Sequence, residues 1–204
     1  VLQYLATHRS RFENELCEYL RMPSISAQSN HKEDVRAAAD WLVKHCCGIG
    51  LKAKKHAPGF HPIVTASTPK RSGKRPHFLV YGHYDVQPVD PLELWDTPPF
   101  QPSERDNRLY GRGTVDDKGQ FYLHLKAMES WLLSCGELPV NVKVIVEGEE
   151  EVGSESLEPF LENNREMLSA DVAVISDTSM IKKGWPSITS VSYTHLRAHE
   201  TDSY

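Results

Sequence analysis

Three apolar runs, each ending in or followed by acidic or histidine residues, constrain the fold of this chain more than any other feature. They cover residues 77–81, 140–146 and 171–177 and read "HFLVY", "VNVKVIV" and "DVAVISD". Short apolar runs bounded by turn residues are typical of buried strands. Charged side chains at the end of a buried strand need polar or charged partners. The ends of these strands are therefore the first candidates for a functional site.

Helical patterns and shorter strands fill the rest of the chain. Apolar residues recur at helical spacing in three stretches, and glycine is expected to end two of them, at Gly48 and Gly136. Ser154 or Ser156 fits as the cap of a further helix, and Pro159 in its first turn favours the later one. The expected helices and short strands lie near 12–20, 35–46, 51–56, 62–67 and 119–134. Strands alternating with helices predict an α/β fold, a three-layer sandwich with a central mixed, largely parallel sheet.

A segment rich in proline and aromatic residues, 87–107, is too long for a simple connection. Loops of this length in compact domains are usually functional or disordered. Trp95, Pro99 and Phe100 give the segment enough apolar mass to pack, which favours a functional loop.

The polar residues at the strand ends are predicted to meet. In open α/β sheets, ligands bind beyond the carboxyl ends of the strands. If the three strands are parallel, one rim of the sheet collects His83, Asp85, Glu150, Glu151 and Asp177. Asp116 and Asp117 directly precede the helix expected at 119–134 and join the same group of candidates.

Each of these features has an ordinary explanation when taken alone. His83 and Asp85 resemble a hydrogen-bonded loop, Asp116 or Asp117 resembles a helix N-cap, and 147–151 resembles a solvated acidic loop. Their convergence changes the interpretation, because carboxylates on one rim repel one another unless cations neutralise them.

Two divalent metal ions would neutralise the rim. An imidazole with carboxylates and no thiolate suits zinc, manganese or cobalt in a hydrolytic site. Asp85, two residues after His83, is placed to orient that histidine.

The composition excludes several function classes. The net charge is −5 and no basic stripe stands out, so we expect no nucleic-acid partner. The spacing of the four cysteines (17, 46, 47 and 135) fits neither a zinc knuckle nor a disulfide framework, which indicates a reducing compartment. No stretch is apolar enough to span a membrane and no signal peptide is apparent, so we expect a cytoplasmic protein without membrane contact.

Four linked motifs make the chain resemble a known family. They read "YGHYDVQP", "GRGTVDDKGQ", "EGEEEVGSESLE" and "ISDT". In this order and approximate spacing they are similar to the dinuclear zinc exopeptidases, which include dipeptidases, carnosinase, glutamate carboxypeptidase, acetylornithine deacetylase and succinyl-diaminopimelate desuccinylase. The segment that connects the first two motifs looks most like the dipeptidase and carnosinase branch. The resemblance covers residues 1–189.

The resemblance implies two bound metal ions, a small peptide substrate and a role for each of six residues. His83 and Asp177 would bind the first metal, Asp116 would bridge the two metals, Glu151 would bind the second, Asp85 would hydrogen-bond His83, and Glu150 would be the general base. In the family, the two metals lower the pKa of a shared water, whose proton the general base transfers to the leaving amine. The Asp116–Asp117 peptide bond is expected to be cis.

The chain also departs from the family. Members carry a late histidine ligand for the second metal and an inserted lid and dimerisation domain, and neither is found in 1–189. Residues 190–204 do not continue the pattern and are expected to be a non-native tail, so the pair His195 and His199 is not taken as a metal site. We therefore expect this fragment to be inactive and its full-length parent to be a homodimeric metallodipeptidase.

Two alternatives remain open. The first is an N-acyl-amino-acid deacylase of the same fold, which shares the metal motifs and differs in its substrate pocket; the loop around Trp95 favours the dipeptidase. The second is a non-catalytic metal-binding remnant, against which the presence of Glu150 counts. A nucleotide-binding domain is set aside, because Gly111–Gly113 lacks the strand–glycine–helix context that such a site needs.

Overall fold

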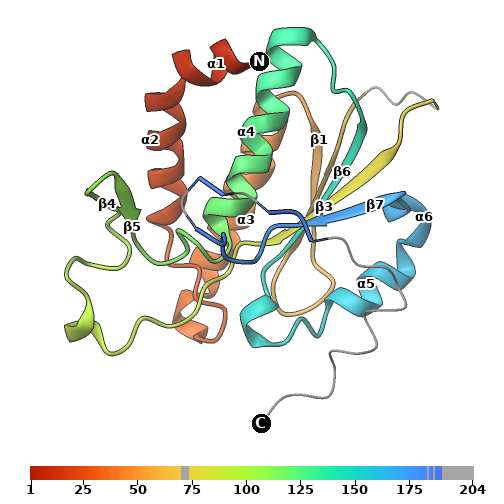
Figure 1. Cartoon of the computed structure of the whole chain (residues 1–204). Helices are drawn as coiled ribbons and strands as arrows, with labels where there is room; N and C mark the ends of the chain where they lie inside the picture. Colours follow the sequence, from red (N-terminus) through yellow and green to blue (C-terminus); the bar gives the residue numbers. More distant parts are fainter. Residues whose placement is uncertain (70–73, 183, 186, 190–204) are drawn as a thin grey trace.

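The computed structural model describes residues 1–69, 74–182, 184–185 and 187–189. Its centre is a five-stranded sheet (Figure 1). In spatial order the strands are β1 (Lys52–His56), β2 (Ile63–Ser67), β6 (Asn141–Glu147), β3 (His77–His83) and β7 (Val172–Ile175). Residues 190–204, including His195 and His199, lie outside the described part, so the expectation of a non-native tail remains a prediction.

The sheet is mixed, with a parallel part that carries the three apolar runs. β1 pairs antiparallel with β2, and β2 antiparallel with β6. β6, β3 and β7 are parallel to one another, in a register that pairs His83 with Glu147 and Tyr81 with Ile175. The carboxyl ends of these three strands therefore lie at one edge, as predicted.

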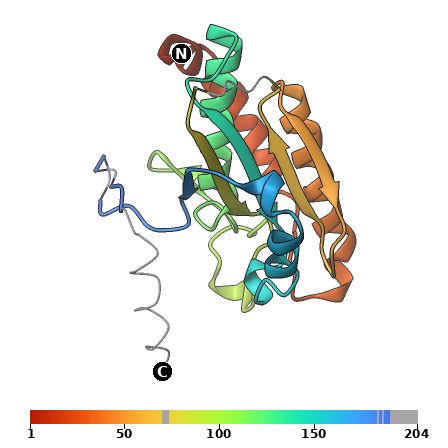
Figure 2. The ribbon, with the colours of Figure 1, turned by 90° about the vertical axis from the view of Figure 1, so that its right-hand side faces the viewer.

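Helices cover both faces of the sheet (Figures 1 and 2). The helices on one face are α1 (Leu2–Thr7), α2 (Arg9–Leu20), α3 (Lys32–Gly48) and α4 (Lys118–Cys135), and those on the other face are α5 (Leu157–Asn163) and α6 (Arg165–Leu168). A small hairpin of β4 (Ser103–Arg105) and β5 (Arg108–Tyr110) lies apart from the sheet. The three-layer α/β sandwich predicted from the sequence is confirmed.

Two hydrophobic cores follow from the alternation of side chains along the strands. Val144 and its neighbours on one face pack with Leu42 and Phe121 in the larger core, under the long helices. Ile145 points the other way and packs with Phe160 of α5 in the smaller core. Fully burying each such side chain stabilises the fold by about 1.5–3 kcal/mol. The sheet rim is thus anchored from both sides.

The helix ends match the sequence predictions in part. Gly48 was predicted to cap its helix, which is wrong: α3 includes Gly48, and the left-handed residue is Gly50, with φ +94°. The helix continues because the Ile49 N–H still bonds the His45 carbonyl. Gly136 is the left-handed cap of α4, as predicted. No helix in the described ranges is both long enough and apolar enough to cross a bilayer.

Candidate metal centre

The predicted site residues meet at the carboxyl edge of β6, β3 and β7. His83 is the last residue of β3, and Asp177 follows β7 by two residues. Glu150 and Glu151 belong to a short 3₁₀ helix, η3 (Glu150–Val152), directly after β6. Asp116 lies two residues before α4. Four segments that are far apart in the sequence thus supply one site. Three of them meet because the parallel strands end at the same edge, and the fourth is the turn before α4.

The distances converge on one atom, the Nε2 of His83. It lies 3.1 Å from Asp116 Oδ1, 3.6 Å from Asp177 Oδ2 and 3.9 Å from Glu150 Oε2. Glu151 joins this group, since ligand atoms of His83, Asp116 and Glu151 all lie within 4.8 Å of one another. All the residues predicted to bind metal are therefore brought together.

His83 is fully buried, and its Nε2 has no hydrogen-bond partner. Its other ring nitrogen, Nδ1, lies 3.1 Å from the backbone oxygen of Asp85 and 3.4 Å from Asp85 Oδ1. Residue 85 thus holds the ring through its carbonyl more closely than through its carboxylate. A donation from Nδ1 to Asp85 leaves the lone pair of Nε2 directed at the carboxylates.

The Asp85 carboxylate has a second task. Its Oδ2 accepts the backbone N–H of Glu151 at 3.1 Å, which ties the end of β3 to the turn that carries the two adjacent glutamates. Gln87 donates its side-chain N–H to Glu151 Oε2 at 2.6 Å. Both contacts fix the direction of Glu151.

Burial and mutual repulsion perturb the titration of the group. Burial first, and then the neighbouring carboxylates, raise the pKa of Glu150 and of Glu151. His83 lowers the pKa of Glu150, and the hydrogen bond from Gln87 and then His83 lower that of Glu151. Burial by itself would lower the pKa of His83, but the carboxylates around it, Asp85 foremost, raise it to about 10. A positive charge among these carboxylates would therefore stabilise the group.

Asp117 was among the sequence candidates without a predicted role, and the structure shows that it contacts His83. It occupies the N-cap position of α4 without making a side-chain cap bond, and its Oδ2 instead accepts the backbone N–H of His83 at 3.2 Å. Burial, more than nearby acids, raises its pKa to about 7. The Asp116–Asp117 peptide bond is cis, as expected. The sequence signal for this contact is Gly82, where an added Cβ would lie 2.6 Å from Asp117 Oδ2.

The donor set fits a divalent cation. A buried imidazole nitrogen without a partner, surrounded by carboxylate oxygens, offers the nitrogen and oxygen ligands that zinc, manganese and cobalt accept. A dication would offset the repulsion among the deprotonated carboxylates, which adds to burial in raising the pKa of Glu150 and of Glu151.

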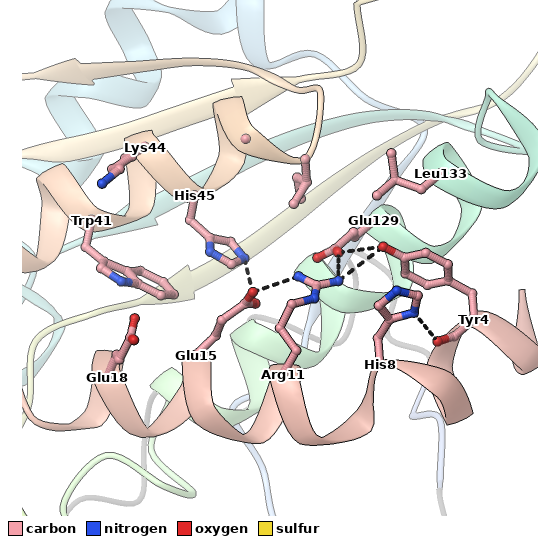
Figure 3. Close-up of a pocket in the computed structure, with 12 residues that line it drawn as sticks. Tyr4, His8, Arg11, Glu15, Glu18, Trp41, Lys44, His45, Glu129 and Leu133 are labelled. Atoms are coloured by element: carbon pink, nitrogen blue, oxygen red, sulfur yellow. Dashed lines mark hydrogen bonds and ion pairs between the residues drawn. The ribbon is translucent and has the colours of Figure 1, made fainter.

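A second group of possible ligands, Glu15, His45 and Glu129, lines a cavity of about 630 Å³ between α2, α3 and α4 (Figure 3). Here the charges are already balanced. Lys126 lies 2.7 Å from Glu15 and 2.6 Å from Glu129, and Arg11 contacts both carboxylates as well. These ion pairs make the cluster a structural network, in contrast to the unneutralised rim.

Comparison with known proteins places the chain in a family. The sequence pattern of Peptidase family M20/M25/M40 matches residues 79–201. A cysteinylglycine-S-conjugate dipeptidase of Corynebacterium striatum is 32% identical over 194 residues, covering 95% of this chain and 42% of the relative.

Two solved structures share the fold. Human carnosine dipeptidase 1 superposes with a TM-score of 0.81 at 30% identity, over 89% of this chain and 41% of its own. An M20 family metallo-carboxypeptidase, Sso-CP2 from Sulfolobus solfataricus, gives a TM-score of 0.76 at 37% identity, over 83% of this chain and 38% of its own. The chain thus spans about two fifths of the length of these relatives. Rim geometry, donor chemistry and sequence agree, and the chain belongs to Peptidase family M20/M25/M40.

Proposed function

We propose that the protein to which this chain belongs is a metal-dependent hydrolase that cleaves dipeptides or short peptides. One observation carries the proposal. The buried Nε2 of His83 has no hydrogen-bond partner and faces three carboxylates at 3.1–3.9 Å. What distinguishes this nitrogen from other buried imidazole nitrogens is that three carboxylates converge on it, and these would repel one another without a cation among them.

The proposed metal residues are His83, Asp116, Glu151 and Asp177. Two divalent ions are proposed, zinc in the first place and manganese or cobalt as alternatives. When bound, such ions lower the pKa of a water and polarise the scissile carbonyl. Asp85 orients the His83 ring from behind, and Asp117 fixes the backbone of the same residue.

Glu150 is proposed as the general base. Its side chain is 36% exposed, so it reaches both solvent and the His83 group. Its raised pKa brings it closer to the value at which a carboxylate accepts a proton from water and returns it to the leaving amine.

The substrate proposal rests on the names of relatives. The most similar ones include a cysteinylglycine-S-conjugate dipeptidase and a β-Ala-His dipeptidase, and a solved relative is a carnosine dipeptidase. We infer a small peptide as substrate. A homodimeric assembly and the cytoplasm are proposed for the full-length protein, the latter with support from the four free thiols. Because relatives are more than twice as long, the 204-residue chain alone is proposed to be inactive.

The test uses the full-length protein and a panel of dipeptides and N-acetyl amino acids. We expect zinc- or manganese-dependent release of amino acids from dipeptides. In Glu150→Gln, turnover should fall by at least about 100-fold while the metal content stays the same, since general base catalysis contributes roughly 10²–10⁴-fold. The exposed Glu155→Gln is the matched control and should keep full turnover. Cleavage of N-acetyl amino acids only would identify a deacylase, and unchanged turnover in Glu150→Gln would remove Glu150 from the mechanism.

A further inference from the structure

The acidic run at 147–151 divides into two pairs that face different ways. Glu150 and Glu151 face the His83 group. Glu147 and Glu149 are buried, with 1% and 4% of their surface exposed. Buried carboxylates are rarely retained without a set of hydrogen bonds to hold them, so the contacts of the buried pair need an explanation.

Glu149 accepts three hydrogen bonds through its carboxylate. Oε1 accepts the backbone N–H of His61 at 2.7 Å and the hydroxyl of Ser156 at 2.9 Å. Oε2 accepts the backbone N–H of Ser156 at 3.1 Å. The residue thereby joins the segment before β2 to the start of α5.

The backbone of Glu149 closes the turn that presents the two site glutamates. Its carbonyl accepts the N–H of Val152 at 3.1 Å and the N–H of Ser154 at 2.8 Å. On the opposite side of the same turn, the Glu151 N–H bonds to Asp85 Oδ2. Two buried residues, Asp85 and Glu149, therefore hold the turn through different contacts.

The surroundings of Glu149 leave little room for adjustment. An added Cβ on Gly59 would lie 1.8 Å from Ser156 Oγ and 3.5 Å from Glu149 Oε1. The chain before His61 consequently packs directly on the Ser156–Glu149 contact.

The contacts require a carboxylate in particular. The three partners are all donors, and only an ionised carboxylate accepts at both oxygens without offering a donor of its own. A glutamine of the same size would direct its NH₂ group at an N–H or a hydroxyl and would lose at least one bond.

We propose that Glu149 is a positioning residue, which sets the direction in which Glu150 and Glu151 face the metals. This inference rests on the proposed metal site. It assigns to a buried glutamate the task of holding the general base and one ligand from outside the site, without touching metal or substrate itself.

The test compares Glu149→Gln with Glu155→Gln, an exposed glutamate six residues further along the chain. Circular dichroism first establishes that each variant folds. Co²⁺ titration then gives the affinity and the visible absorption spectrum, which reports ligand geometry and not stability. We expect Glu149→Gln to bind Co²⁺ about 10–100-fold more weakly, with shifted bands, as for other changes behind metal ligands. Glu155→Gln should match the parent in both.

Hydrogen exchange in the metal-free protein supplies a second readout. Glu149→Gln should speed amide exchange in residues 150–156 and at His61. If that variant fails to fold, Ser156→Ala, which removes one of the three donors, should show the same spectral change in weaker form. If the parent binds Co²⁺ normally and the spectra of Glu149→Gln and Ser156→Ala are the same as that of the parent, the inference is overturned and the proposed metal site is not. Failure of the parent to bind Co²⁺ would overturn the proposed metal site and the inference with it.

Discussion

Gly82 lies one residue before His83 and directly faces the start of α4. A Cβ at this position would lie 2.6 Å from Asp117 Oδ2 and 2.7 Å from Phe121 Cδ2. The bond between Asp117 and the His83 N–H exists because residue 82 has no side chain. A similar approach occurs at Gly148, where a Cβ would be 2.4 Å from the Tyr84 hydroxyl.

Gly82→Ala should lower the free energy of unfolding by about 1–3 kcal/mol, because an added methyl forces packed side chains apart. It should also weaken metal binding, since Asp117 and His83 must move. The control is Gly48→Ala, which lies in helix α3 with nothing within 4 Å of the added Cβ. That change should be neutral or stabilise by roughly 0.5–1 kcal/mol. Urea unfolding measures the free energy of unfolding of both variants. Equal changes in Gly82→Ala and Gly48→Ala would contradict the packing argument.

The sequence indicated which side chains meet, and it did not indicate how they are held. The six candidates all follow strands or precede a helix, so the pattern placed them at one rim. The contact of Asp117 with a backbone N–H, and those of Glu149 with His61 and Ser156, depend on turn geometry that residue type does not specify. Ser156 was expected to cap α5; it holds that position, but its hydroxyl bonds Glu149 instead.

An ionic network joins α2 to α4, because Lys126 and Arg11 each contact both Glu15 and Glu129. Figure 3 shows Arg11 between these two carboxylates. His45 of α3 lies beside the network, stacked on Trp41 with ring centroids 4.5 Å apart. Burial first, and then the positive charge of Lys126, lower the pKa of His45 to about 4, although Glu15 and Glu129 act in the opposite direction. The histidine is therefore neutral in the folded state at neutral pH.

This shift predicts a loss of stability in mild acid. The unfolded chain protonates His45 near pH 6.5, whereas the folded chain does so near pH 4. Between these values the unfolded state binds more protons, so the free energy of unfolding falls as the pH drops from 6.5 towards 4. His45→Gln should make this fall shallower. Thermal unfolding at pH 7, 5.5 and 4.5 tests the prediction, and identical slopes in parent and variant would refute it.

Element types were easier to predict than strand direction. The long apolar and amphipathic segments gave strands and helices close to those observed, and the third run shortened to Val172–Ile175. The antiparallel pairing of β2 with β6 had no sequence signal, because hydrophobic pattern does not encode which way a neighbouring strand points.

The proposed metal site joins connections after β3, β6 and β7 with the turn before α4. A bound ion would therefore stabilise the whole molecule through linkage, because the unfolded chain does not hold these ligands together. The free-energy gain is about 2.7 kcal/mol when free metal is 100 times its Kd.

Zinc should accordingly raise the Tm of the metal-free protein by several degrees, and EDTA should reverse the rise. Asp116→Asn, which removes one proposed ligand charge at a half-exposed position, should unfold at the Tm of the metal-free parent and respond weakly to zinc. Differential scanning fluorimetry across a zinc series measures the effect. Equal zinc responses in parent and variant would argue against the site.

The two edge strands of the sheet differ in their exposed side chains, and this difference affects where a further strand can be added. β1 carries the exposed side chains of Lys52, Lys54 and Lys55, and in the described residues β7, at the other border, exposes Val172 and Ile175. Rows of lysine discourage a further strand from joining, whereas an apolar border invites one. Growth of the sheet by addition of another strand, from this polypeptide or from a foreign one, is therefore directional and favoured on the β7 side.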